Sequence, residues 1–405
     1  MKTMILSIAL FLGLLLTGCL FAEDQPAETP AAETPAADFT FALFRAVTET
    51  RSGENLTVSP YGAGLTLEMV LAGAANETEA QIAKALGGEG REPFRPFSDK
   101  TLSVATMMLL QKDIPVLETF RDTIKNEFKA ALEPVDFTAD SAEAVKKINA
   151  WCSKKTNGKI PVLFDRFGET TRCVLASALY FAADWKTSFD KDATLDANFT
   201  LADGTKTKTK IMSRVGLMNF GQTDETAVLE LPYKTEGYAM FLLLPKKPAE
   251  FAAWESTVTS EKFKTLRAAA APTQVNLRMP RFTMESSMTL NAPLEKLGIS
   301  AAFTTDADFS KINGHNDLYL SEVRQKTFIK VDETGTEAAA ATAAVIAVKS
   351  AVLNVQPFYA DRPFLYAIVK GDTVLFLGRF VKPDAEPEAP PFVDPGLSGE
   401  AGAFN

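Results

Sequence analysis

Apolar residues recur at three- and four-residue intervals through the first part of the chain, as they do in helices that bury one face. This spacing predicts helices over residues 39–50, 61–74, 119–131 and 140–155. After Thr170 the pattern changes to short apolar runs separated by turn-forming residues, which predicts strands. The strands are expected in the segments RCVLASALYFAADW, AVLELPY, YAMFLLLP, VNLRMPRFTME, FIKVDE, FLYAIVK and TVLFLGRFV. Helices followed by many strands predict an α+β fold with a large mixed or antiparallel sheet.

Neither end of the chain has the pattern of a folded domain. Residues 1–18 carry Lys2 and then an apolar run that is too short to cross a bilayer and typical of a signal peptide. The run ends in Leu-Thr-Gly-Cys at Cys19, which resembles a bacterial lipobox; the alternative is an ordinary signal peptide with a chance cysteine. Residues 19–38 repeat Pro, Ala, Glu and Thr and predict a disordered tether behind a lipidated Cys19. Residues 384–405 predict a disordered tail, which leaves residues 39–383 as the expected domain.

Composition narrows the function classes. The chain has 405 residues, 46% of them hydrophobic, which is enough for a sizeable core. Its 42 basic and 51 acidic residues give a net charge of −9, which argues against a nucleic-acid partner. The single histidine, His315, lies among turn-forming residues and is interpreted as a solvated loop residue. One histidine and no phosphate-binding glycine loop leave little material for an enzyme, a metal site or a nucleotide cofactor.

Two cysteines remain in the expected domain once Cys19 is assigned to lipidation. Cys152 follows Trp151 on an expected helix, and Cys173 opens an expected strand. Outside the cytoplasm they would form one disulfide, or they are two buried thiols. The sequence leaves both alternatives open because it does not give the distance between the two Cα atoms.

The segment from Glu333 to Ser350, ETGTEAAAATAAVIAVKS, consists mostly of small residues. Its alanines would suit a helix, and its composition would equally suit a flexible loop. If it becomes a strand, the even-numbered residues from Thr336 to Ile346 share an uncharged face. The other face carries its one charge, Glu337, at the beginning. Such a strand would slide between existing strands with little steric penalty and no buried charge.

This segment resembles the hinge and reactive-centre loop of the serpin family. The matching hinge residues are Glu333, Gly335, Thr336, Glu337, Ala338, Ala339, Ala340, Ala341 and Thr342. Further motifs follow the family's order across residues 39–383. They are NLTVSP at 55–60, INAW at 148–151, TNGKI at 156–160, ALYF at 178–181, LELPY at 229–233, MPRF at 279–282, ADFS at 307–310 and DRPF at 361–364.

The resemblance implies the serpin fold, in which helices of the N-terminal half pack on a large mixed sheet with further smaller sheets and an exposed reactive-centre loop. It also implies a suicide inhibitor of serine proteases, not an enzyme, that needs no cofactor. In that mechanism the cleaved loop inserts into the central sheet and the protease stays attached as an acyl-enzyme. Insertion of residues 336–347 would add a strand of about 40 Å at 3.3 Å per residue.

Counting along the loop from Glu333, as in the family, places the reactive bond at Lys349-Ser350. A lysine there suits trypsin-like proteases, whose specificity pocket is acidic. A shift of one residue to Val348 would instead favour elastase-like targets. The alternative function is a non-inhibitory serpin-fold lipoprotein that acts as a binding module or a protease substrate.

The residues that control sheet opening depart partly from the family pattern. The shutter and breach positions are Ser59, Pro60, Ser177, Trp185, Arg281 and Gln325. The family typically pairs an asparagine with a histidine in the shutter, and Ser177 and Gln325 occupy those positions here. Both side chains still form hydrogen bonds, but their span differs. Arg281 aligns with a basic residue that pairs with the Glu333 position.

The remaining expectations concern partners and location. Residues 87–103, where the family's cofactor-binding helix would lie, are short, so no polyanionic cofactor is expected. The chain is expected to be a monomer that is exported and lipid-anchored. Leu20 is not the acidic residue that often retains lipoproteins in the inner membrane, which favours the outer membrane or cell surface over another periplasmic site.

Overall fold

The computed structural model describes residues 35–138, 141–168, 170–336 and 355–384. The first helix, α1 (Pro35–Thr50), begins inside the segment expected to be tether, so residues 35–38 are helical. Proline is favourable in the first turn of a helix and the alanines that follow favour helix, which explains the earlier start.

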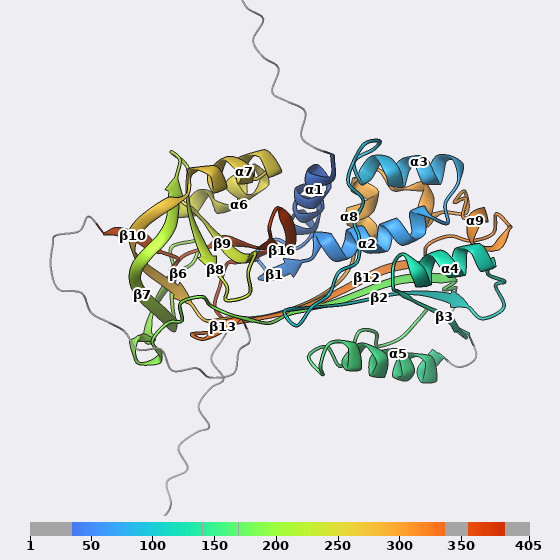
Figure 1. The fold of residues 1–405 in the computed structure, drawn as a ribbon, viewed down its shortest axis with the longest axis horizontal. Coiled ribbons are helices and arrows are strands. Elements are labelled where there is room, and N and C mark those ends of the chain that lie inside the picture. Colours follow the sequence, from blue (N-terminus) through green and yellow to red (C-terminus); the bar gives the residue numbers. More distant parts are fainter. Residues whose placement is uncertain (1–34, 139–140, 169, 337–354, 385–405) are drawn as a thin grey trace, which may run out of the picture. The chain divides into compact units, whose positions relative to one another are not determined.

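The three longest α-helices among the described residues lie in the N-terminal half, and the other helices are divided between the two halves (Figure 1). They are α2 (Pro60–Leu71), α3 (Asn76–Ala85), α4 (Glu118–Asn126) and α5 (Ser141–Lys155), followed later by α6 (Phe251–Ser256), α7 (Ser260–Ala269), α8 (Asn291–Lys296) and α9 (Ser310–Asn313).

The strands among the described residues form two sheets. The β4–β12 sheet has the order β3-β2-β4-β12-β13-β5, and β11 pairs with the other edge of β12. Its strands are β2 (Leu102–Gln111), β3 (Ala131–Val135), β4 (Cys173–Phe181), β5 (Ala183–Asp184), β11 (Phe282–Thr289), β12 (Glu322–Val331) and β13 (Gly335–Thr336). It is a mixed sheet, because β12 runs parallel to β4 and antiparallel to β11.

The second sheet, the β7–β10 sheet, has the order β1-β16-β15-β9-β8-β7-β10-β14, with β6 paired to β7. Its strands are β1 (Leu56–Val58), β6 (Leu195–Thr200), β7 (Lys206–Gln222), β8 (Thr226–Pro232), β9 (Tyr238–Pro245), β10 (Ala271–Pro280), β14 (Gln356–Tyr359), β15 (Phe364–Lys370) and β16 (Thr373–Phe380). Together with the helices, the two sheets confirm the α+β class.

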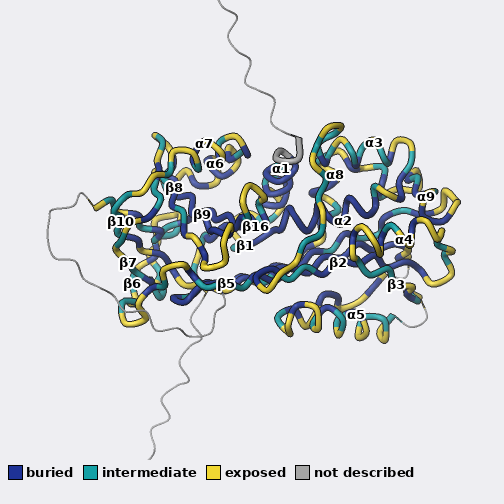
Figure 2. The backbone as a smooth tube through the Cα atoms, in the orientation of Figure 1, coloured by how far each residue is buried: buried dark blue, intermediate teal, exposed yellow. Residues whose placement is uncertain are grey.

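The central strand β4 is covered on both faces, as its uncharged sequence predicts. All of its residues are buried. Val174, Ala176 and Ala178 pack in the cluster that contains α5, whereas Leu175 and Leu179 belong to clusters on the opposite side. Figure 1 shows α5 and α2 on opposite sides of this sheet, and Figure 2 shows that the outer face of α5 is exposed.

Helix α2 is buried along nearly its whole length. Ser59 caps its N-terminus by accepting a hydrogen bond from the Gly62 N–H at 3.0 Å, and Pro60 occupies the first turn. Gly62 faces β4, where an added Cβ would overlap the side chain of Leu179. The glycine therefore lets α2 approach the sheet closely, which brings Ser59 to the middle of β4 and β12.

Two sequence expectations need correction. The segment VNLRMPRFTME, expected as one strand, is the end of β10 and the start of β11, which lie in different sheets. The chain changes sheets at Arg281, where the alternation of buried side chains is interrupted. The expected helix over 119–131 ends at Asn126, because Ala131 already pairs with β2 as the first residue of β3.

Candidate functional site

The hinge of the expected reactive loop is part of the β4–β12 sheet. Gly335 and Thr336 form β13, which pairs antiparallel with β12 at Val331 on one side and with β5 on the other. A turn connects β12 to β13, closed by a hydrogen bond from Asp332 N–H to the Gly335 carbonyl at 2.9 Å. The first residues of a strand between β12 and β5 are therefore already in place.

Gly335 is required by the close packing of the hinge. A Cβ at this position would overlap the Ala183 carbonyl oxygen of β5, which is backbone and cannot move aside. The glycine predicted at the hinge from sequence thus has a specific steric role.

Thr336 is fully buried at the end of the β4–β12 sheet where β13 lies between β12 and β5. We call this end the top of the sheet. Its hydroxyl lies 2.7 Å from the phenol oxygen of Tyr233, with which it shares a hydrogen bond. Burial raises the pKa of Tyr233 far above its usual value, so the phenol stays neutral. Tyr233 belongs to the LELPY motif, but nothing in the sequence indicated that it contacts the hinge.

Trp185 stacks on Tyr233 and hydrogen-bonds to the hinge turn. Its ring stacks on Tyr233, with 4.5 Å between the ring centroids and 10° between the planes. Its indole N–H donates to the Asp332 carbonyl at 2.9 Å, and its backbone N–H donates to the Thr334 carbonyl at 2.9 Å. Trp185, predicted from sequence as a breach residue, therefore packs against Tyr233 and binds the backbone of the hinge turn.

The carboxylate of Asp332 organises the turn from within. Burial disfavours its charged form, but hydrogen bonds from the Thr334 hydroxyl and N–H and the nearby Lys330 outweigh this, so the pKa of Asp332 is lowered. The hydrogen bonds to Thr334 are 2.6 Å and 2.9 Å long, and the Lys330 nitrogen lies 3.3 Å away. Asp332 therefore contributes to the turn as an anion.

Arg281 and Glu333 form the expected ion pair, with 3.9 Å between nitrogen and oxygen. The Glu333 side chain is 8% exposed, but that of Arg281 is 50% exposed. A pair of this length with a half-exposed partner contributes little to stability.

The middle of the same sheet is closed. β4 and β12 pair directly in parallel from Glu322, opposite Val174, to Ile329, opposite Phe181. No other strand separates them over this range. Insertion of a further strand would require these two strands to part.

The shutter residues meet in this closed region. Gln325 lies opposite Ser177, and its amide nitrogen is 3.4 Å from the Ser177 hydroxyl. The Gln325 side chain also accepts from the Ser59 N–H at 2.6 Å and donates to the Ser59 carbonyl at 2.9 Å. All three residues are almost completely buried. Gln325 therefore joins β12 firmly to the start of α2 and only weakly to β4.

A second set of hydrogen-bonded polar residues lies beside the shutter and was not predicted from the sequence. Thr57 of β1 accepts from the Thr327 hydroxyl at its carbonyl, donates its N–H to the Ser286 hydroxyl, and shares a hydroxyl hydrogen bond with Tyr366. These residues are buried, so the hydrogen bonds couple β1, β11, β12 and β15. These hydroxyl residues are far apart in the sequence, and no sequence pattern indicates that they contact one another.

Several predicted site residues lie outside the described residues. They are the lipidation site Cys19, the reactive bond Lys349-Ser350, and the hinge residues Glu337, Ala338, Ala339, Ala340, Ala341 and Thr342. The same holds for the signal peptide, most of the expected tether, and the tail from residue 385.

The described residues contain no disulfide, metal site or membrane-spanning helix. Cys152 and Cys173 are both free and buried, and burial raises the pKa of each thiol to about 12. His315 is exposed in a turn. Within the described ranges, no group of acidic, cysteine and histidine side chains is arranged to hold a metal ion, and no helix has the length and apolarity to cross a membrane.

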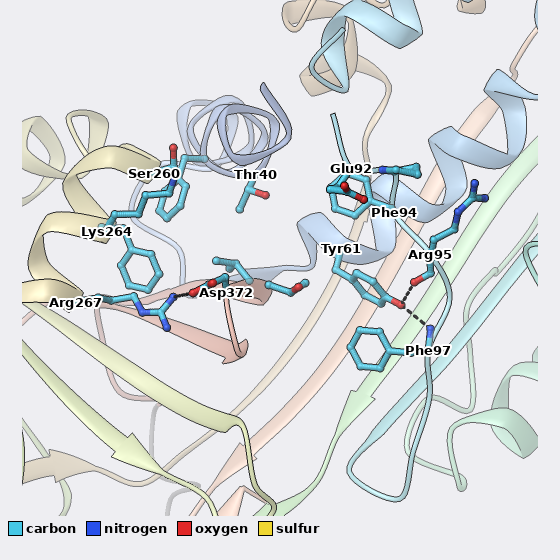
Figure 3. A pocket seen from close by; sticks show the side chains of 15 residues that line it. Thr40, Tyr61, Glu92, Phe94, Arg95, Phe97, Ser260, Lys264, Arg267 and Asp372 are labelled. Atoms are coloured by element: carbon cyan, nitrogen blue, oxygen red, sulfur yellow. Dashed lines mark hydrogen bonds and ion pairs between the residues drawn. The ribbon is translucent and has the colours of Figure 1, made fainter. Parts of the chain in front are cut away.

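Residues 91–99, within the expected short segment, form an extended loop without regular secondary structure. Glu68 of α2 holds it through a buried ion pair with Arg91 and a hydrogen bond from Phe94 N–H at 3.0 Å. The loop borders a cleft of about 540 Å³, with Tyr61 and Phe97 on one side and Lys264 and Arg267 on the other (Figure 3). The cleft is lined by α1 and α7 and contains no residue of the hinge or shutter.

Comparisons with known proteins agree with this geometry. A family model described as Serpin (serine protease inhibitor) matches residues 34–383. The chain belongs to the serpin family, whose members are in general inhibitors of serine proteases and not enzymes. The leukocyte elastase inhibitor of Sus scrofa is 34% identical over 369 residues, covering 85% of this chain and 97% of that protein.

Solved structures show the same fold. The thermophilic serpin tengpin in its native state has a TM-score of 0.79 and 30% identity, covering 86% of this chain and 93% of its own. Human thyroxine-binding globulin complexed with thyroxine has a TM-score of 0.78 and 25% identity, covering 87% and 98%. One fold thus supports both protease inhibition and ligand binding, so the activity of this chain must be argued from its own residues.

Proposed function

We propose that this chain is a suicide inhibitor of trypsin-like serine proteases. The protease serine attacks the Lys349 carbonyl, the Lys349-Ser350 bond breaks, and the new amine at Ser350 leaves. The Lys349 acyl group remains on the protease as an ester. Residues 336–347 then insert into the β4–β12 sheet and carry the protease away before water completes the hydrolysis.

The observation that carries this proposal is the position of β13. Its two residues lie between β12 and β5, directly above the closed part of the sheet. A strand that continues from Thr336 has one path available, between β12 and β4. A hinge strand in the sheet next to a directly paired β4 and β12 supports the proposal that insertion begins at Thr336.

The register of β13 gives the position of each inserted residue. Thr336 lies opposite Val331 of β12 and Ala183 of β5. Continued without a bulge, this antiparallel register brings Thr342 opposite both Gln325 and Ser177. Residues directly opposite each other point to the same face. The Thr342 hydroxyl would thus enter the polar shutter group and replace the 3.4 Å contact between Gln325 and Ser177.

Backbone hydrogen bonding favours the inserted state. Insertion breaks the parallel ladder between β4 and β12 and forms two antiparallel ladders, one on each side of the new strand. The small side chains of the inserting segment add little steric hindrance, and none of the residues from Thr336 to Ala347 is proline. The Gln325 bonds to Ser59 do not cross the gap and survive the separation.

Lys349 supports a trypsin-like target because a basic side chain complements an acidic specificity pocket. Cleavage one residue earlier, after Val348, is the second candidate. The relative named leukocyte elastase inhibitor gives that alternative weight. Mass analysis of the released C-terminal fragment distinguishes the two, since it begins with Ser350 in the first case and Lys349 in the second.

The proposal includes export and a lipid anchor at Cys19. The support is the signal-like residues 1–18, the lipobox-like ending and the Pro-rich residues that follow. Such an anchor would hold a monomeric inhibitor at the outer membrane or cell surface. We expect a Cys19→Ala chain to leave the membrane fraction and to inhibit as the anchored protein does.

The central experiment mixes the chain with trypsin and follows the products on a denaturing gel. A 1:1 adduct that survives denaturation is expected, together with release of the fragment that follows Lys349. A Lys349→Ala chain should fold normally and lose rapid inhibition of trypsin. Cleavage in the loop with release of active trypsin would instead favour the alternative, a non-inhibitory lipoprotein that is a binding module or protease substrate.

A further inference from the structure

A second cleft lies between helices α1 and α6 and shares no residue with the cleft of Figure 3. Its volume is about 480 Å³, which falls in the range of small-molecule sites. The end of β16 and the turn that joins β6 to β7 form its other sides (Figure 1). We call it the α1–α6 cleft. No residue of the hinge or the shutter lines it.

The lining of the α1–α6 cleft includes a buried ion pair with one unsatisfied oxygen. Glu255 of α6 and Arg379 of β16 are 5% and 3% exposed, and Glu255 Oε2 lies 2.7 Å from the Arg379 guanidinium. The other carboxylate oxygen, Oε1, accepts no hydrogen bond from any residue that the structure describes. Arg379 also donates to the backbone carbonyls of Glu54 and Arg51. Because a buried acceptor without a donor is costly, Oε1 would gain from a ligand that donates a hydrogen bond.

The ionisation of Glu255 points the same way. Burial raises the pKa of the Glu255 carboxyl, although the neighbouring Arg379 opposes this shift. The ion pair therefore compensates only part of the lost hydration. A further donor on Oε1 would favour the ionised carboxylate.

The charges that line the α1–α6 cleft favour a neutral ligand. Three carboxylates and three basic groups balance one another, so neither a cation nor an anion gains from their sum. An ion would also lose hydration on entering. A hydroxyl group donates to a carboxylate without carrying a charge of its own. The six charged residues are Glu49, Asp203 and Glu255, and Arg45, Arg379 and Lys382.

Apolar side chains beside the ion pair suit an aromatic body. Phe251 of α6, Leu201 of the β6–β7 turn and Val381 after β16 line the cleft. A flat ring buries a large area against such side chains. A phenol hydroxyl, with a pKa of about 10, is more acidic than an aliphatic hydroxyl and is therefore the stronger donor.

We propose that the α1–α6 cleft binds a neutral phenolic molecule, whose hydroxyl donates to Glu255 Oε1 and whose ring packs against Phe251, Leu201 and Val381. The inference is independent of protease inhibition, because the cleft contains no residue of the hinge or shutter. A ligand that contacts α1, α6 and β16 together would stabilise the folded chain.

The test compares 4-methylphenol with toluene, which has the same ring and methyl group but no hydroxyl. Binding of each to the full chain is measured by an NMR titration. We expect 4-methylphenol to bind with a dissociation constant of about 1 mM, as suits so small a ligand. Toluene should bind at least about tenfold more weakly, because it makes no hydrogen bond to the charged oxygen.

Two variants test the place of binding. Glu255→Gln replaces the charged acceptor by a neutral one of similar size. It should weaken 4-methylphenol about tenfold and leave toluene unchanged, and thermal unfolding checks that the fold survives loss of the ion pair. Leu201→Ser alters the apolar wall away from that pair and should weaken both ligands severalfold. The matched control is Leu195→Ser on β6, which is 66% exposed outside the cleft and should change neither affinity.

Three results would overturn the proposal. Equal affinity of the wild-type chain for 4-methylphenol and toluene would mean that no hydroxyl meets Oε1. No binding of 4-methylphenol at about 10 mM would mean that water suffices as the partner of this oxygen. Binding of 4-methylphenol that neither Glu255→Gln nor Leu201→Ser weakens would place the phenol in another cleft, such as that of Figure 3.

Discussion

The top and the middle of the β4–β12 sheet differ in which strand lies beside β12. At the top, β13 already separates β12 from β5, and Thr336 is buried against Tyr233. In the middle, β4 and β12 still pair directly, and Gln325 is anchored to Ser59. The same strand β12 therefore borders an occupied gap at one end and a closed ladder at the other.

In the mechanism proposed above, this difference would place the barrier to loop insertion in the middle of the sheet. The top would need no further rearrangement, because Thr336 already contacts Tyr233 and the hinge turn is already hydrogen-bonded to Trp185. The middle must lose eight parallel residue pairs before the next loop residues can enter. The contact that crosses the gap at the shutter is the long one between Gln325 and Ser177, whereas the short hydrogen bonds lead to α2. We therefore expect the paired strands β4 and β12, rather than the shutter side chains, to supply most of the resistance to insertion.

The largest effect is expected from Thr336→Arg at the top. The Thr336 side chain is fully buried and its hydrogen-bond partner, the Tyr233 phenol, is neutral, so a charged side chain there would be desolvated at a cost of several kcal/mol. Insertion slows and hydrolysis of the acyl-enzyme overtakes it. Each 1.4 kcal/mol on the insertion barrier changes the partition about tenfold.

The measurement for Thr336→Arg is the number of inhibitor molecules consumed per protease inactivated, which should rise at least about tenfold. Thr336→Ser keeps the hydroxyl and the small size and serves as the matched control. A ratio near the wild-type value for the arginine variant would mean that insertion past Thr336 is not the inhibitory step.

A smaller effect is expected from Gln325→Leu in the middle. Leucine fills similar space but leaves the Ser59 N–H buried without a partner. The Ser59 carbonyl loses the Gln325 donor but keeps the hydrogen bond from the Ala63 N–H at 3.0 Å. The free energy of unfolding should fall by about 2 kcal/mol, measured by denaturant unfolding. The same substitution at exposed Gln222 should change it by less than about 0.5 kcal/mol. Equal effects at both positions would show that the Ser59 bonds contribute nothing to the closed sheet.

Tyr233→Phe tests the hydrogen bond at the top while keeping the stack on Trp185. Loss of a bond between two neutral hydroxyls should lower the free energy of unfolding by about 1 kcal/mol. Combining it with Thr336→Val should add little further, because both changes remove the same bond. Fully additive effects in this double-mutant cycle would place Thr336 outside the buried site before cleavage.

The smallest effect is expected from Asp332→Asn, and it should depend on pH. The pKa of Asp332 is lowered in the folded chain, so its contribution is fully present above its unfolded value near 3.8. That contribution is lost as pH falls through the lowered folded value. Thermal unfolding of the two proteins should therefore differ near neutral pH and converge once the pH falls below the lowered pKa of Asp332 in the folded chain. A gap that stays constant across this range would assign the effect to shape instead of charge.

The fold class was predictable because it depends on the local periodicity of apolar residues, whereas the hinge was predicted from the family resemblance. Periodicity predicted α1, α2 and α5, and the uncharged run predicted β4 as a strand covered on both faces. The boundary between β10 and β11 was missed, because the apolar pattern of the segment does not indicate the point where the chain passes from one sheet to the other. β2 was also missed, since its apolar residues lie in a part of the chain whose neighbours are helical.

The sequence by itself determined the alternation of small residues at the hinge, the single histidine, and the motifs that identify a serpin. It also provided the position of Lys349 and the glycine that the hinge requires. These features depend on the order of residues within one segment or on composition, so they can be identified without knowing which other segments pack against them.

Only the tertiary structure decided which residues meet. Tyr233 and Thr336 are 103 positions apart, and Gln325 and Ser59 are 266 apart, yet each pair shares a buried hydrogen bond. A hydroxyl or amide in a strand does not specify its partner, because that depends on register, on the approach of α2 over Gly62, and on which face is covered.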